Sequence, residues 1–143
     1  FLSLCGGDTA SYRLAFLFMM CFVGMPTIFY GDELGVQGIR EEEYRAPMPW
    51  KGGDMALSGF FRKAIAMRHA LSPLRDGTFQ MLSAEEGSRV IRFRRDTGAA
   101  SVTVAINAGE SDAAIPQSEE TLYWAEGLQN GILSPGGFSV TYR

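Results

Sequence analysis

Cysteine and histidine are both scarce in this chain, which contains two Cys and one His among 143 residues. Two cysteines are too few for a disulfide framework, and Cys5 and Cys21 do not have the spacing of a metal-binding pair. Cys21 lies inside an apolar run, where a cysteine is typically a small buried hydrophobe. This scarcity is compatible with a reducing compartment and slightly favours the cytoplasm, while the sequence leaves the localisation open. Zinc spacings, Gly-rich phosphate loops and nucleophile elbows are absent, so we expect no metal and no cofactor.

Long hydrophobic runs and dense basic patches are missing as well. The apolar run over residues 14–23 is about half of the ~20 residues that cross a bilayer, and it lacks the features of a signal peptide. The net charge is −3, and the basic residues are scattered except for one group, Arg89, Arg92, Arg94 and Arg95. Because side chains alternate along a strand, we predict that these arginines lie on the solvent face of one strand. We expect neither a membrane nor a nucleic acid as a partner.

The N-terminal half has the pattern of one repeat of a parallel β/α architecture. Residues 14–23 predict a helix buried on all sides, and Gly24 and Pro26 end it. Residues 27–30 predict a short buried strand, followed by a polar segment at its carboxyl end. One such repeat cannot close a sheet, and a (β/α)8 barrel needs roughly 250 residues. We therefore expect this chain to be the end of something larger.

The polar segment over residues 31–54 separates two predicted helices. Asp8 or Thr9 is placed to cap the first helix, and Asp54 is placed to cap the second. Loops as long as residues 31–54 usually carry a function, and in parallel β/α folds function collects in the loop after a strand. The second helix ends at Pro73, and one face of it is apolar, with Leu57, Phe60, Phe61, Ala64, Ile65 and Leu71.

After about residue 78 the hydrophobic pattern changes to a period of two. Apolar and polar residues alternate over residues 91–94, 102–107 and 138–142, and turn signals at Glu86-Gly87 and Asp96-Thr97-Gly98 separate such runs. This pattern predicts an antiparallel β domain. The predicted fold class is an α+β chain, in which a helix-strand-helix unit is followed by a small antiparallel β-sandwich.

Three segments in this order carry a resemblance to a known family, namely residues 1–8 (FLSLCGGD), 24–35 (GMPTIFYGDELG) and 45–50 (RAPMPW). They are similar to the end of the catalytic barrel in the α-amylase superfamily, glycoside hydrolase family 13. The strongest likeness is to the cyclomaltodextrinase and neopullulanase branch. The resemblance implies that residues 1–77 are a remnant of a (β/α)8 barrel. It also implies that residues 78–143 are the C-terminal β domain that follows this barrel.

The resemblance implies retaining hydrolysis of α-glucans such as maltodextrins, cyclodextrins or pullulan. That chemistry needs a nucleophilic carboxylate and a protonated carboxylic acid about 5 Å apart. In the resembled family these groups and a third carboxylate lie on strand ends that precede the present segment. We therefore expect no catalytic residue in this chain and no hydrolysis by the chain alone, although the parent protein would be an enzyme.

Arg45 and Glu41 are the predicted substrate-binding residues. Members of the resembled family carry an arginine in this loop, with an acidic residue four positions before it, near the non-reducing sugar of the cleavage site. Arg45 matches, and Glu41 holds the acidic position, although the family usually has Asp-Pro there. The alternative is that Arg45 only pairs with an acid of its own loop on the surface. A forked guanidinium suits paired sugar hydroxyls and carboxylates.

Asp32, Glu33 and Tyr30 are predicted to support the site. Asp32 and Glu33 follow the predicted strand, so they hold the loop backbone or support the sugar site from behind. The acidic run Glu41-Glu42-Glu43 is typical of a solvated loop. Trp50 is predicted to fill a core, and Tyr123 and Trp124 favour core packing over a starch-binding platform.

Two other interpretations stay open. The β domain is alternatively a carbohydrate-binding or structural module, or the chain is a piece of a non-enzymatic amylase relative. All three interpretations leave the apolar helix without its expected neighbours. We therefore expect the isolated chain to self-associate, or to fold this helix over the β domain in an arrangement unlike that of the parent.

Overall fold

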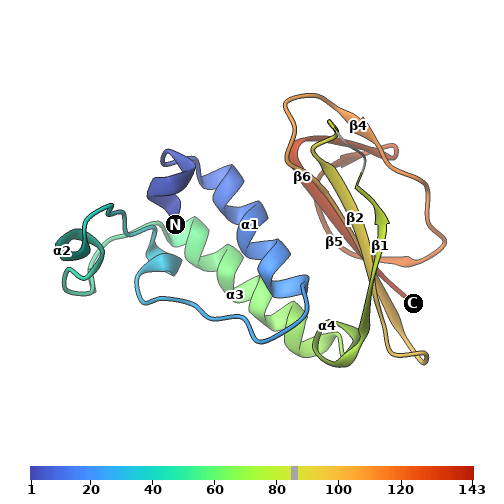
Figure 1. Ribbon diagram of the computed structural model, residues 1–143, viewed down its shortest axis with the longest axis horizontal. Helices are drawn as coiled ribbons and strands as arrows, with labels where there is room; N and C mark the ends of the chain where they lie inside the picture. Colours follow the sequence, from blue (N-terminus) through green and yellow to red (C-terminus); the bar gives the residue numbers. More distant parts are fainter. Residues whose placement is uncertain (85–86) are drawn as a thin grey trace.

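The computed structural model describes residues 1–84 and 87–143, and it has a helical layer packed on one face of a curled antiparallel sheet (Figure 1). The two long helices are α1 (Thr9–Cys21) and α3 (Met55–Ala70). The shorter helical turns are η1 (Leu2–Cys5), η2 (Asp32–Leu34), α2 (Glu41–Tyr44) and α4 (Pro73–Asp76). The loop that carries α2 projects from the end of the molecule opposite the sheet (Figure 1).

Both long helices begin where the sequence predicts. The Asp8 carboxylate accepts hydrogen bonds from the backbone N–H groups of Ala10 and Ser11, at 3.0 and 3.1 Å. The Asp54 carboxylate accepts one from Leu57 N–H at 2.9 Å. These bonds satisfy donors that the first turn of a helix leaves unpaired. The caps therefore fix the start of each helix, and the two predicted helices are confirmed.

The strand predicted over residues 27–30 is not formed. This segment is extended, has no paired strand among the described residues, and leaves Ile28, Phe29 and Tyr30 exposed by 37, 46 and 45%. A parallel strand exists only through hydrogen bonds to its neighbours, and the described residues supply none. For the same reason α1 is not buried on all sides, since Phe18 and Met19 are only partly buried.

The C-terminal half forms the predicted antiparallel β domain. Its strands are β1 (Thr78–Ser83), β2 (Val90–Asp96), β3 (Ser101–Asn107), β4 (Ala113–Ala114), β5 (Thr121–Gln129) and β6 (Ile132–Tyr142). The strands β1, β2, β3 and β6 pair in this order. The other edge of β6 pairs with β5, and the first residues of β6 pair with β4. The expected sandwich thus takes the form of one curled sheet. The turn predicted at Glu86-Gly87 lies partly outside the described residues.

Apolar side chains of one sheet face and of both long helices make a common core. The alternation along the strands points Phe93, Val104 and Phe138 towards the helices, where they are at most 1% exposed. Phe60 of α3 packs against Trp124 of β5, with ring centroids 4.9 Å apart. Trp124 is 5% exposed, which confirms its predicted core position. Each such aromatic side chain contributes on the order of 2 kcal/mol of burial free energy.

The Cys21 thiol belongs to the same core. Its side chain is fully buried, as predicted, and burial raises its pKa to about 12. At neutral pH the thiol is therefore protonated and unreactive, because the thiolate is the nucleophilic form. Cys21 acts here as an apolar packing residue.

Arg95 contradicts the prediction that the arginine group lies on the solvent face. It is 1% exposed and lies on the same sheet face as Phe93, two residues away. Its guanidinium donates hydrogen bonds to the carbonyl oxygens of Cys21 and Leu74, both at 3.0 Å, and of Gly77 at 2.8 Å. Because side chains alternate between the two faces of a strand, position 95 faces the core like position 93. The carbonyl groups supply the hydrogen-bond partners that a buried guanidinium requires.

A second guanidinium reaches the same end of α1 from α3. Arg68 donates hydrogen bonds to the carbonyl oxygens of Met20 at 2.6 Å, Phe22 at 3.1 Å and Gly24 at 2.6 Å. The last carbonyls of a helix have no intrahelical partner, so a buried helix end needs such donors. Arg68 and Arg95 together join the end of α1 to both α3 and β2.

Glu120 fixes the segment that precedes β5 to the outer face of the sheet, away from the helices. Its carboxylate accepts hydrogen bonds from Arg94 at 2.8 Å, Thr103 at 3.1 Å and Thr141 at 2.5 Å. Burial raises the pKa of this carboxyl, but the hydrogen bonds from Thr141 and Thr103 and the charge of Arg94 outweigh it. The pKa of Glu120 therefore lies below its usual value of 4.5.

Replacing Arg95 tests the joint at the end of α1. We predict that Arg95→Ala lowers the free energy of unfolding by about 3 kcal/mol or more, because it leaves buried carbonyl groups unpaired. Urea denaturation followed by circular dichroism measures the change. The exposed Arg89 is the matched control, and Arg89→Ala is expected to change stability by less than about 0.5 kcal/mol. Equal effects of the two substitutions would contradict the structural role of Arg95.

The lowered pKa of Glu120 predicts a dependence of stability on pH. A carboxyl with a depressed pKa in the folded state stabilises that state above the pKa of the unfolded chain. This contribution is lost as the pH falls below about 4.5 through the folded-state pKa. We predict that Glu120→Gln flattens the fall in stability between neutral and acid pH, measured by urea denaturation at each pH. Its exposed neighbour provides the control, since Glu119→Gln is expected to leave the profile unchanged.

Candidate functional site

The candidate site is the loop over residues 31–54, which connects the unpaired extended segment to α3. Its regular elements are the single turns η2 and α2, so the irregular loop predicted from the sequence is confirmed. At Gly31 the backbone has a positive φ of 88°, and a Cβ there would lie 2.8 Å from Cγ2 of Val36. Only glycine fits this turn without a clash.

The carboxylates of Asp32 and Glu33 hold the backbone at the start of this loop. Asp32 accepts a hydrogen bond from Phe29 N–H at 3.2 Å, and Glu33 accepts one from Gly31 N–H at 3.0 Å. The hydroxyl of Tyr12 on α1 donates to the carbonyl oxygen of Asp32 at 3.3 Å. Burial, with the negative charge of Asp32 nearby, raises the pKa of Tyr12. The predicted backbone role of both acids is thus seen, and their support of a sugar site stays a prediction.

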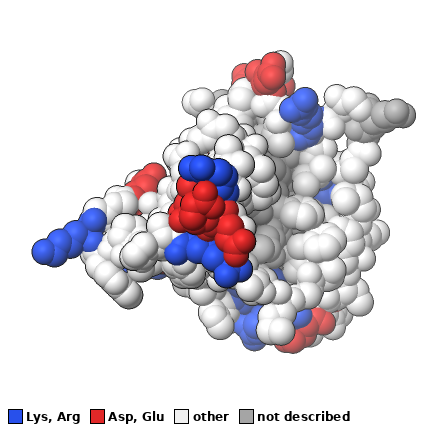
Figure 2. All heavy atoms as spheres, turned by 60° about the vertical axis from the view of Figure 1, so that its left-hand side comes forward, with Lys and Arg blue, Asp and Glu red and all other residues white. Residues whose placement is uncertain are grey.

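Arg45 and Glu41 meet at the surface. Arg45 Nε lies 3.1 Å from Glu41 Oε1, and both side chains are 65% exposed. Figure 2 shows acidic and basic side chains gathered on this end of the molecule. An exposed pair of this kind stabilises a fold by less than about 1 kcal/mol. The Arg45 guanidinium therefore contributes little to the stability of the fold.

Glu43 has a structural role that the sequence analysis missed. Its carboxylate accepts hydrogen bonds from the backbone N–H groups of Ile39 at 2.9 Å and Arg40 at 3.1 Å. The bond from Ile39 is the main cause that lowers the pKa of Glu43. An acid three positions after a helix start is the signal for such a cap. The acidic run is therefore partly a capping device, not only a solvated surface.

Aromatic side chains surround a small hollow of about 190 Å³ beside this loop, lined by Phe1, Phe29, Tyr30, Asp32, Val36, Gly38 and Tyr44. Tyr30 is half-exposed, and its hydroxyl donates to the carbonyl oxygen of Ala46 at 3.4 Å. Of the five predicted site residues, Tyr30 and Asp32 line this hollow, whereas Glu33, Glu41 and Arg45 do not. Two aromatic residues of this hollow were not predicted from the sequence: Phe29, which lies just before the polar loop, and Tyr44, which lies within it.

Trp50 does not fill a core. Its side chain is 87% exposed at the end of the loop, so the predicted core position is wrong. The described residues place no second layer over this end of the chain, and a core position requires one. Tyr123 is also 39% exposed, unlike its neighbour Trp124.

The described parts of the chain contain neither a candidate metal site nor a candidate membrane span. No three His, Cys, Asp or Glu side chains there come together as a possible metal site. None of the described helices combines the length and hydropathy needed to cross a bilayer.

Comparisons with curated proteins give partial relatives among enzymes of α-glucan metabolism, although no family profile matches the chain. Neopullulanase 2 of Thermoactinomyces vulgaris is 36% identical over 124 residues, which is 85% of this chain and 21% of the relative. Cyclomaltodextrinase of a Bacillus species is 37% identical over 103 residues, 71% of this chain and 18% of the relative. The chain therefore spans about a fifth of the length of these relatives.

Solved structures show the same arrangement of helices and sheet. The debranching enzyme of Nostoc punctiforme superposes with a TM-score of 0.84 and 27% identity over 99% of this chain and 32% of that protein. A cyclomaltodextrinase superposes with a TM-score of 0.79 and 28% identity, over 98% of this chain and 27% of that protein. The curled sheet matches the C-terminal β-rich domain of these enzymes. The expectation that α1 packs in an arrangement unlike that of the relatives is therefore wrong.

Proposed function

The chain belongs to the α-amylase superfamily, glycoside hydrolase family 13, and we propose that it is the C-terminal part of an enzyme that hydrolyses α-glucans. In this proposal residues 1–77 complete the catalytic barrel, and residues 78–143 form the β domain behind it. The substrates are maltodextrins, cyclodextrins or pullulan. The observation that carries the proposal is the superposition of nearly the whole chain, with its loop, on enzymes of this kind.

The unpaired segment over residues 27–30 supports the barrel role. It is extended and exposed, and it leads directly into the polar loop. In a barrel this segment becomes a strand when neighbouring strands satisfy its backbone groups. The loop after it then lies at the carboxyl end of the strands, where the active sites of such barrels are found.

Arg45 is the residue that we assign to substrate binding in the assembled enzyme. Its guanidinium is exposed, charged and paired only with Glu41 among the described residues. The same pair presents a forked donor and a carboxylate to a sugar, which suits vicinal hydroxyl groups. Tyr30, Asp32 and Glu33 support this arrangement from the start of the loop, through the backbone contacts that hold its turn.

The chain by itself is not expected to cleave glycosidic bonds. Retaining hydrolysis needs two carboxyl groups that face one bond, one of them protonated. The acids of the candidate loop serve other contacts, since Asp32 and Glu33 bind backbone groups while Glu41 and Glu43 pair with arginines. We assign the catalytic acids to the upstream part of the parent protein.

A chimera tests the proposed function. Residues 1–143 replace the corresponding C-terminal fifth of neopullulanase 2 from Thermoactinomyces vulgaris, and hydrolysis of maltodextrin is measured. We expect an active chimera in which Arg45→Ala lowers kcat/KM by roughly tenfold or more, since a charged hydrogen bond contributes about 1.5–3 kcal/mol. Arg40→Ala is the matched control, because Arg40 is equally exposed in the same cluster. A folded chimera in which both substitutions act alike would contradict the role of Arg45.

The exposed apolar segment before the loop also predicts self-association of the isolated chain. Met25 is 92% exposed and Phe29 is 46% exposed, in a segment that the proposal places inside a barrel. Exposed apolar surface of this kind favours association. Light scattering is expected to give a mass that rises with concentration, and the double substitution Met25→Lys, Phe29→Lys is expected to lower it. Met81→Lys, on the sheet edge, is the control. A monomer at every concentration would refute this prediction.

A further inference from the structure

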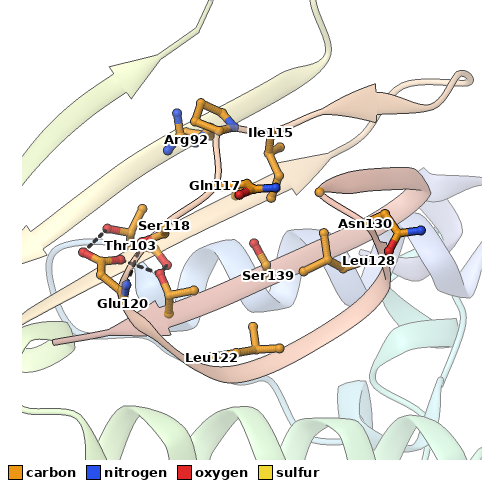
Figure 3. A pocket seen from close by; sticks show the side chains of 14 residues that line it. Arg92, Thr103, Ile115, Gln117, Ser118, Glu120, Leu122, Leu128, Asn130 and Ser139 are labelled. Carbon is orange, nitrogen blue, oxygen red and sulfur yellow. Dashed lines mark hydrogen bonds between the residues drawn. The ribbon is translucent and has the colours of Figure 1, made fainter.

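The outer face of the sheet carries a cavity that the proposed function does not use. It has a volume of about 330 Å³ and lies between the sheet and the segment that connects β4 to β5 (Figure 3). Ligand-binding clefts begin at about this size, roughly 300 Å³. Ala105 and Ser139 of the lining alternate with the core residues Val104 and Val140, so the cavity lies on the sheet face away from the helical layer. The loop with α2 lies at the other end of the molecule (Figure 1).

The floor of the cavity is hollow because its central side chains are small. Ala105 of β3 and Ser139 of β6 are paired across the two strands and both line it. Larger residues lie on either side, with Thr103 towards one end and Leu128 towards the other (Figure 3). Thr141, the strand partner of Thr103, also lines the cavity. The small side chains of Ala105 and Ser139 therefore leave an empty space beneath the segment that connects β4 to β5.

Two polar groups in this cavity are placed to accept or donate further hydrogen bonds. Ser139 lines the cavity, and its hydroxyl makes no side-chain hydrogen bond within residues 1–84 and 87–143. The hydroxyl borders the open space and is not a buried unpaired group, so it is available to a ligand group. Within the described residues, Arg94 and Thr103 donate to Oε1 of the ionised Glu120 carboxylate, whereas Thr141 donates to Oε2. Each carboxylate oxygen accepts two hydrogen bonds, so Oε2 has capacity for another donor.

The remaining lining sets the chemical class of the ligand. Apolar side chains of Ile115, Leu122 and Leu128 face the same space as the amides of Gln117 and Asn130. A ring with an apolar face and a rim of hydroxyl groups matches such a lining, because it buries carbon atoms and pairs its hydroxyls with the polar groups. The lining carries the negative charge of Glu120, which is paired with Arg94, and the positive charge of Arg92, so neither sign of charge dominates and a neutral ligand fits it.

We propose that this cavity binds one glycosyl unit of a neutral saccharide, at a site separate from the barrel loop. The choice of an α-glucan as the saccharide rests on the proposed function. A hydroxyl of the sugar donates to Glu120 Oε2, another pairs with Ser139, and the ring packs beside Leu128. Such a site tethers a long glucan chain to the β domain while another part of it reaches the barrel.

Calorimetric titration of the 143-residue chain with maltotriose tests this inference. Wild-type chain is expected to bind, and Ala105→Leu, which fills the floor, is expected to weaken binding at least tenfold. Ser139→Val is a second variant that replaces the hydroxyl with a methyl group and adds one further methyl group, and it is expected to weaken binding as well. Gln80→Leu places a leucine at an exposed position of β1 outside the cavity lining and is expected to bind like wild type. Circular dichroism verifies that each variant is folded.

The outcomes separate this inference from the proposed function. Loss of binding in Ala105→Leu and Ser139→Val, with binding kept in Gln80→Leu and Arg45→Ala, supports the cavity site. Binding that is lost in Arg45→Ala and kept in Ala105→Leu overturns the inference and favours the loop. A flat titration of the wild-type chain also overturns it, and leaves the activity of the chimera to decide the proposed function.

Discussion

The C-terminal end of α1 is the point on which the arrangement of this molecule depends. Arg68 from α3 and Arg95 from β2 converge on the carbonyl groups of residues 20–24, and both guanidinium groups are almost removed from water. Buried carbonyl groups without hydrogen bonds are unfavourable, and so are buried charges without partners. The arginines and the carbonyl groups at the helix end therefore stabilise one another. The helical layer is thereby fixed to the sheet by polar contacts as well as by the aromatic core.

This joint also sets the direction in which the chain leaves the helix. Gly24 is bound by Arg68, so the extended segment that follows begins from a fixed position. Asp32 and Glu33 then tighten the turn that leads into the loop. A rigid anchor before a loop is what a binding site on that loop requires. The side chain of Arg45 on this loop is 65% exposed, as its proposed role in substrate binding requires.

Much of the fold was predictable because it depends on local signals. The caps at Asp8 and Asp54 and the alternation along β2 and β3 each arise from neighbours in the sequence. The errors arose where a residue depends on distant partners. Alternation along the strand was applied to the arginines as one group, yet Arg94 and Arg95 are adjacent and face opposite sides, and the spacing of Arg95 from Phe93 places it in the core. Residues 27–30 have strand-forming composition, yet a strand needs partners that the described residues do not contain. The cavity on the outer face left no local signal, because Ala105 and Ser139 become neighbours only through pairing of β3 with β6.

The sequence alone determined the two helices, the change to an antiparallel β domain and the likeness to glycoside hydrolase family 13. Hydrophobic period, caps and motif order are properties of short segments, and no folding is needed to see them. Tertiary structure decided which arginines are buried, which acids cap turns and where a hollow remains. These features depend on atoms that lie far apart in the chain, such as Arg95 and Cys21, and only folding brings such atoms within hydrogen-bonding distance.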